Sequence, residues 1–314
     1  MKTFLINLFF IICTFTVNSK DFDFFDFHHN VLWNYYNENY KTVIDEINSH
    51  QDSIITYNDV WQGIFFRLQM YSAIQLKDKD LLQDLINKHQ ALIDRYIGYD
   101  GIYLAEDFDK VADKKLKNTF NDSTQVIINE TISDNGNYEL AYYLLKLNRN
   151  KSFHRNNATW ETTANMFDST FVIDSLFINK IDKISTILTN KYLPKITKLI
   201  DEYGFPTAKN YGNIADIAWS VIHHSNDETI VKYYPTIEKL YTTYQISSID
   251  FAYYYDRYSL IVNNVQYYGT QFVKDKATGK FIMSPVQLPD DLETINERRA
   301  TVGLDSLKNK DFNY

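Results

Sequence analysis

Apolar residues recur every three or four positions along the first part of this chain, which is the spacing of helices with one buried face. Leu32, Tyr36, Val43 and Ile47 carry this pattern and predict a helix from Val31 to about Ser49. Because the connections between such segments are short, we expect neighbouring helices to pack as antiparallel hairpins. The same spacing predicts further helices over 59–76 and 80–97, and weaker ones over 108–117, 138–147 and 158–167.

The second part of the chain continues with helices that have clearer ends. A helical stretch is predicted from Ile173 to Lys191, with Pro194 restarting it and Gly204 ending it. The next helix is expected to begin after Asn213, which is a favourable N-cap residue, and to be followed by one over 227–244. Ser247 and Asp250 then predict the start of another helix, because they form a variant of the capping box.

Helical periodicity is lost from Gln266 to Gln287. Two β-prone segments, 270–274 and 280–284, flank a turn in which Gly279 supplies the tight backbone conformation. The predicted fold class is therefore mainly α, with helical hairpins or a bundle and one small C-terminal β-hairpin. We expect a signal peptide over 1–19, an N-terminal helical-hairpin region over 20–168, and a helical domain over 169–314 that ends in the hairpin and a short helix.

The start of the chain resembles a secretory signal peptide. Lys2 precedes an apolar stretch from Phe4 to Val17, and a small-residue exit favours cleavage after Ser19. That stretch is short for a membrane span, so we expect a secreted or periplasmic protein with no integral membrane span after cleavage. Cys13 is the only cysteine, so cleavage removes the means to form disulfides, cysteine nucleophiles and thiolate metal sites.

Composition narrows the range of partners. The formal net charge of −8 argues against nucleic acid and anionic lipid, both of which select basic surfaces. The 25 tyrosines and 21 phenylalanines are numerous. AT-rich codons explain this abundance, and stacking of aromatic rings on the sugars of an envelope glycan is the alternative explanation.

Two adjacent histidines, His223 and His224, close the helix that follows Asn213. Counting about 100° per residue places His223 on a polar face with Asp216 and Ser220, and places His224 half facing the interior. A Ser-His-Asp triad is conceivable on the polar face, although Asp216 also has a simpler role as a negative charge at a helix N-terminus. No metal site is predicted, because adjacent helical histidines diverge and no HExxH spacing is present.

Several short segments, in a fixed order, resemble a known family. They are Tyr203–Pro206, His223–Ser225, Tyr255–Arg257, Gln266–Phe272 and Glu297–Leu307. Together they resemble a bacterial family of domains of unknown function, numbered 6624, over about residues 173–312, and the Tyr-Gly-Thr-Gln-Phe run is the most specific part. The resemblance implies that His224, Asp256, Arg257, Gln266 and Gln271 are family positions, with glutamine often replacing His223. It implies no activity.

Two functions are compatible with these positions. The preferred one is a binding or interaction module of the cell envelope, whose partner is an envelope protein or glycan and in which the polar residues form a buried network. The alternative is a hydrolase-like envelope enzyme in which His224 is the general base and Asp256 orients it. No cofactor is implied, and the candidate binding residues are Arg257, Gln266, Tyr268, Thr270, Gln271 and Arg299.

Overall fold

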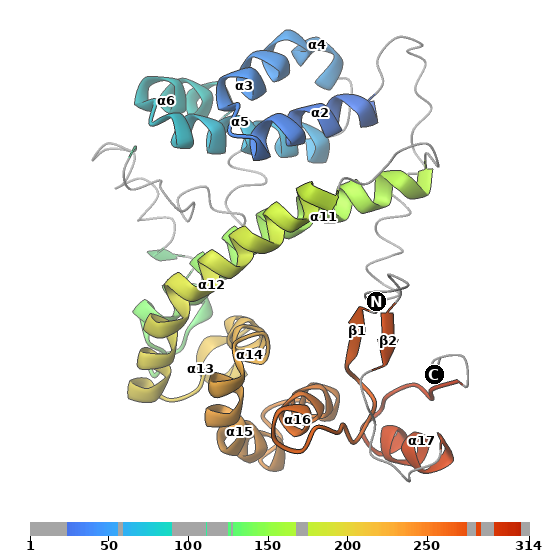
Figure 1. Ribbon diagram of the computed structural model, residues 1–314. Helices are drawn as coiled ribbons and strands as arrows, with labels where there is room; N and C mark the ends of the chain where they lie inside the picture. The colour runs from blue at the N-terminus through green and yellow to red at the C-terminus, as the bar shows by residue number, and fades with distance from the viewer. Residues whose placement is uncertain are drawn as a thin grey trace. The chain divides into compact units, whose positions relative to one another are not determined.

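A computed structural model shows that the protein is mainly helical, as the sequence predicts (Figure 1). It describes residues 24–55, 59–89, 111, 125–126, 128–167, 175–274, 281–283 and 292–308. The predicted signal peptide over 1–19 lies outside these residues. The described chain divides into two compact units.

Helices α2 to α6 belong to the first unit, in which α3 packs against α2 and α5, and α5 packs against α6. The sequence predicted one helix from Val31 to Ser49, but two helices are present and the first begins earlier. Glu38 separates them, because its left-handed φ of 65° ends helical geometry there. The bounds are α2 (Phe24–Tyr36), α3 (Tyr40–Ser49), α4 (Gln51–Ile54), α5 (Asp59–Leu76) and α6 (Lys79–Lys88).

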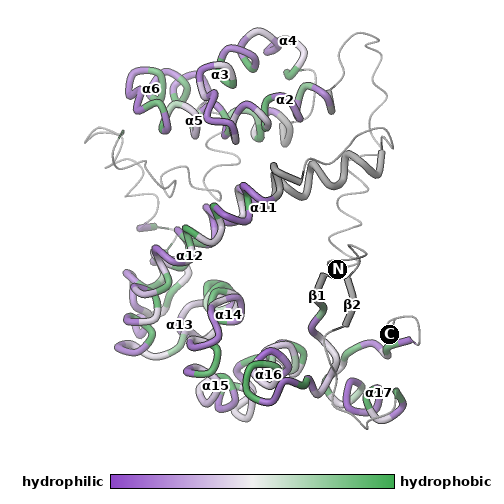
Figure 2. The backbone as a smooth tube through the Cα atoms, viewed as in Figure 1, coloured by the Kyte–Doolittle hydropathy of each residue, from purple (hydrophilic) through white to green (hydrophobic). Residues whose placement is uncertain are grey.

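Two long helices, α11 (Tyr138–Phe167) and α12 (Ser175–Tyr203), each contribute residues to both units. The sequence predicted two weak helices in the range of α11, but a single helix spans it. Pro194 was expected to restart α12, yet the helix continues through it, and the burial of Leu193 and Ile196 offsets the lost backbone hydrogen bond. Hydrophobic and hydrophilic stretches alternate along α12, as expected for a helix with one apolar face (Figure 2).

The second unit continues with α13 (Ala208–Tyr211), α14 (Ile214–His223), α15 (Asp227–Thr242) and α16 (Ser248–Asn263). α15 packs against α16, and the fully buried Tyr254 donates its hydroxyl to the Ile230 carbonyl at 2.9 Å. The predicted capping box of α16 is confirmed, because the Ser247 hydroxyl accepts the Asp250 N–H at 3.0 Å. Asn213 precedes α14 but makes no capping hydrogen bond, because its backbone is already helical.

The loop before α11 fixes the position of α13. The Ser133 N–H donates to the Asn210 carbonyl and the Asn137 N–H donates to the Tyr211 hydroxyl, both at 2.9 Å. A Cβ atom on Gly136 would lie 2.7 Å from the Asn210 carbonyl oxygen, so only glycine allows this approach. The loop therefore holds α13 beside the start of α14.

Beyond α16, two short strands, β1 (Phe272–Lys274) and β2 (Phe281–Met283), pair antiparallel with Phe272 opposite Met283. The turn of the predicted hairpin, residues 275–279, lies outside the described residues, so the hairpin as a whole remains a prediction. The last described helix is α17 (Leu292–Thr301).

Candidate functional site

Asp256, on α16, is completely buried and holds the loop that follows this helix. Its Oδ1 accepts the N–H groups of Tyr267 at 2.6 Å and Tyr268 at 2.8 Å. Its Oδ2 accepts the Thr270 N–H at 2.8 Å and the Thr270 hydroxyl at 2.9 Å. Burial raises the pKa of the Asp256 carboxyl, while these four hydrogen bonds favour the ionised form and oppose that rise. We call residues 266–271 the Asp256 loop.

Gln266 and Gln271, at the two ends of the Asp256 loop, form hydrogen bonds with each other. Gln266 is fully buried, and its Nε2 donates to the Gln271 carbonyl at 3.1 Å. The Gln271 N–H donates to Gln266 Oε1 at 2.8 Å, and Gln271 Nε2 donates to the Tyr253 carbonyl on α16 at 3.2 Å. Both side chains are therefore occupied within the fold.

Arg299 ties α17 to the same loop. Its Nη1 donates to the carbonyls of Tyr268 at 2.7 Å and Gly269 at 3.0 Å, and its Nε donates to the Asp305 carbonyl at 2.7 Å. The side chain is buried, so these bonds satisfy a charge that has little access to water. The structure thus brings together six of the predicted site residues: Asp256, Gln266, Tyr268, Thr270, Gln271 and Arg299.

His224 lies elsewhere, at the turn between α14 and α15, and the side chain of Arg257 on α16 reaches this turn. His224 is exposed, and its Nδ1 lies 3.5 Å from Arg257 Nη1, whose neighbouring Nη2 donates to the Ser225 carbonyl at 3.1 Å. Burial lowers the pKa of the Arg257 guanidinium, while the charge of Asp227 opposes this. The hydrogen bonds of Asp256 come from the Asp256 loop, so His224 and Asp256 do not form the hydrogen-bonded pair that the enzymatic hypothesis requires.

The predicted positions of the two histidines are wrong, because His223 is buried and His224 is exposed. His223 is buried and stacks on Trp219, with ring centroids 4.7 Å apart and planes 8° apart. The ring of Tyr254 on α16 covers this face, with its centroid 5.9 Å from that of His223, so the face points into the interior. His224 is the C-cap residue with ψ of 16°, so a helical count does not give its direction. Burial, helped by the nearby His224 and Arg257, lowers the pKa of His223 to about 3.

No Ser-His-Asp triad forms on this face. The Nδ1 atom of His223 is buried without a hydrogen-bond partner among the described residues, so it donates no orienting hydrogen bond to Asp216. Asp216 and Ser220 instead line a pocket of about 640 Å³. Within the described ranges, no group of three or more His, Cys, Asp or Glu side chains could hold a metal ion.

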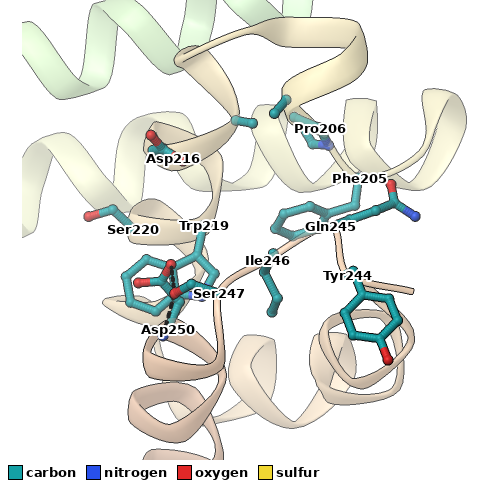
Figure 3. A pocket seen from close by; sticks show the side chains of 12 residues that line it. Phe205, Pro206, Asp216, Trp219, Ser220, Tyr244, Gln245, Ile246, Ser247 and Asp250 are labelled. Carbon is teal, nitrogen blue, oxygen red and sulfur yellow. Dashed lines mark hydrogen bonds between the residues drawn. The ribbon is translucent and has the colours of Figure 1, made fainter. Parts of the chain in front are cut away.

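This pocket is formed by the loop before α13, by one face of α14 and by the connection between α15 and α16. Figure 3 shows how its side chains lie. Three of them are aromatic and five are polar, and none is lysine, arginine or histidine. The lining residues are Phe205, Pro206, Ala208, Ala215, Asp216, Trp219, Ser220, Tyr244, Gln245, Ile246, Ser247 and Asp250.

Sequence reasoning did not identify this pocket. Its residues come from segments that are separated along the chain, so no short motif links them. One signal was available: Tyr244 stands directly after a helix, at a position where glycine is usual.

Comparison of the chain with protein-family models, with curated proteins and with solved structures finds no match. Among the described helices, none is both long enough and apolar enough to cross a membrane.

Proposed function

We propose that the protein is an exported binding module of the cell envelope whose ligand site is the pocket beside α14 and α16. The observation that carries this proposal is the pocket itself. Its volume of about 640 Å³ falls within the range of small-molecule sites, and its mixture of aromatic walls and a few polar groups is typical of them.

The polar residues that carry the family resemblance are better explained by a structural role than by a catalytic one. Asp256, Gln266 and Arg299 are buried, and their hydrogen bonds fix the Asp256 loop between α16 and α17. A general base needs a partner that orients it, and Asp256 is fully engaged with the loop. We infer that the resemblance marks positions that keep this loop in place, and that the hydrolase-like alternative has less support.

Export is proposed from the pattern of the first 19 residues. A signal peptide delivers the acidic, aromatic-rich chain across the membrane, where it would meet envelope proteins and glycans.

The proposal is tested by filling the pocket. Ala208 lines it but is exposed, so Ala208→Trp places a large side chain there without disturbing the core. We expect ligand-observed NMR with a panel of small aromatic and sugar compounds to detect at least one that binds the wild type and is lost in Ala208→Trp, at an unchanged thermal midpoint. Binding that is equal in both proteins, or absent from the wild type, would contradict the proposal.

A further inference from the structure

The pocket has two chemically different ends. α14 contributes Asp216 and Ser220, while the start of α16 adds Asp250. The other end is largely apolar and includes Phe205 and Tyr244. Figure 3 shows Asp216 and Tyr244 far apart along the lining. Figure 3 also shows Trp219 on the same side of the lining as Asp216 and Asp250, so a ligand that fills the pocket meets carboxylates and an indole ring at one end and mainly apolar side chains at the other.

The polar end carries negative charge that the lining does not neutralise. Asp216 is exposed and makes no hydrogen bond or ion pair with another residue of the described chain. Asp250 accepts the Ser247 hydroxyl at 2.7 Å, which leaves its charge in place. Because no basic side chain lines the pocket, the two carboxylates favour a cation and oppose an anion.

Tyr244 lies at the apolar end in a backbone conformation that tyrosine rarely adopts. Its φ is 57°, and it ends α15 in a Schellman arrangement, in which the Gln245 N–H donates to the Leu240 carbonyl at 2.8 Å. Glycine takes this conformation without strain. The tyrosine side chain is 96% exposed, so burial within the fold does not offset the strain. The ring lies at the edge of the pocket, where a bound ligand can reach it.

We infer that the pocket binds an organic ammonium compound. The ammonium group lies at the end formed by Asp216 and Asp250, and the apolar body of the ligand lies against Phe205, Ile246 and Tyr244. Carboxylates and aromatic faces both attract a cation, and the aromatic rings also stack on an apolar body. This inference rests on the proposed function and specifies its ligand class.

Four probes separate charge from shape: benzylamine, benzyl alcohol, benzoate and methyl glucoside. At low ionic strength we expect benzylamine to bind with a Kd on the order of 1 mM. Benzyl alcohol and benzoate share its ring, and we expect them to bind roughly tenfold more weakly or not at all, because they lack the cation. Ligand-observed NMR measures all four, with Ala208→Trp as the control in which the pocket is filled.

Two substitutions then test the ends of the pocket. Asp216→Asn should weaken benzylamine roughly threefold and leave benzyl alcohol unchanged, because only the charge is removed. Tyr244→Gly should keep or raise the thermal midpoint and yet weaken benzylamine, whereas Tyr244→Phe should bind benzylamine like the wild type. Retention of wild-type benzylamine affinity in both Asp216→Asn and Tyr244→Gly would overturn the inference.

The inference and the proposed function fail in different ways. If benzyl alcohol, benzoate or the glucoside binds at least as tightly as benzylamine, and Ala208→Trp abolishes that binding, the ammonium inference is wrong while the pocket remains the ligand site. If no probe binds, or if Ala208→Trp leaves every affinity unchanged, both are wrong.

Discussion

At the scale of single residues, burial separates the two adjacent histidines. His223 lies between Trp219 and Tyr254 and is 5% exposed, while His224 lies at the surface beside Arg257. Protonating a buried imidazole whose Nδ1 has no hydrogen-bond partner costs much more free energy than protonating an exposed one. His223 therefore makes the stability of the fold depend on pH.

The direction of this dependence follows from the sign of the pKa shift. The pKa of His223 falls from 6.5 to about 3 on folding, so the folded protein resists a proton that the unfolded chain accepts. Its effect on stability is absent above pH 6.5, and stability is lost progressively as the pH falls from 6.5 towards 3. We expect His223→Phe, which keeps an aromatic ring beside Trp219, to remove up to about 1.4 kcal/mol of that loss per pH unit.

Urea unfolding of wild type and His223→Phe between pH 7 and pH 4 measures this difference. The pKa values of His28, His89 and His154 are also lowered by burial. Those groups act in both proteins, so their effect cancels in the comparison. Parallel stability curves for the two proteins would show that His223 does not resist protonation in the fold.

Asp256 gives a second prediction at this scale. Asp256→Asn replaces one acceptor oxygen with an N–H₂ group, which cannot accept the hydrogen bonds that the Asp256 loop donates. We expect the free energy of unfolding to fall by about 2–4 kcal/mol, because buried donors lose their partner. Asp182→Asn, at an exposed position on α12, is the matched control and should change stability little. If Asp256→Asn lowers the free energy of unfolding no more than Asp182→Asn does, the proposed role of Asp256 is wrong.

At the scale of elements, local capping and tertiary hydrogen bonds place α16 and α17. Ser247 begins α16 through its own capping box, which the sequence shows. α17 depends on a distant contact, because Arg299 reaches back thirty residues along the chain to the carbonyls of Tyr268 and Gly269. Its attachment therefore cannot be read from its own residues.

Arg299→Met should release α17 from the Asp256 loop. Methionine keeps the apolar volume but donates no hydrogen bond, so three carbonyls lose their donor. We expect faster amide hydrogen exchange throughout 292–301, with α15 unchanged as the internal reference, because the contacts of α15 with α16 do not involve Arg299. Unchanged exchange over 292–301 would mean that other contacts suffice to hold α17.

At the scale of the whole molecule, the described chain forms two compact units, and both the Asp256 loop and the pocket belong to the second. This unit combines a polar network that fixes one loop with a separate pocket that is open to a ligand. In the proposed function, the network is structural and the ligand binds at the separate pocket.

Export is a prediction about the whole chain. If the signal peptide is cleaved after Ser19, the exported protein begins at Lys20 and contains no cysteine. Mass spectrometry of protein recovered from the periplasm or the medium should find this N-terminus, and a thiol reagent should find no reactive group. An intact N-terminus together with one titratable thiol would refute cleavage.

The sequence by itself determined most of the helices of the second unit and the capping box of α16. These features depend on residues within a few positions of one another, so apolar spacing and capping residues reveal them. Only the tertiary structure decided the rest. It buries His223, and it directs the hydrogen bonds of the Asp256 carboxylate to the Asp256 loop. It also brings Phe205, Asp216 and Tyr244 together in one pocket. Burial and convergence depend on which faces of distant segments meet, and periodicity along one segment carries no information about that.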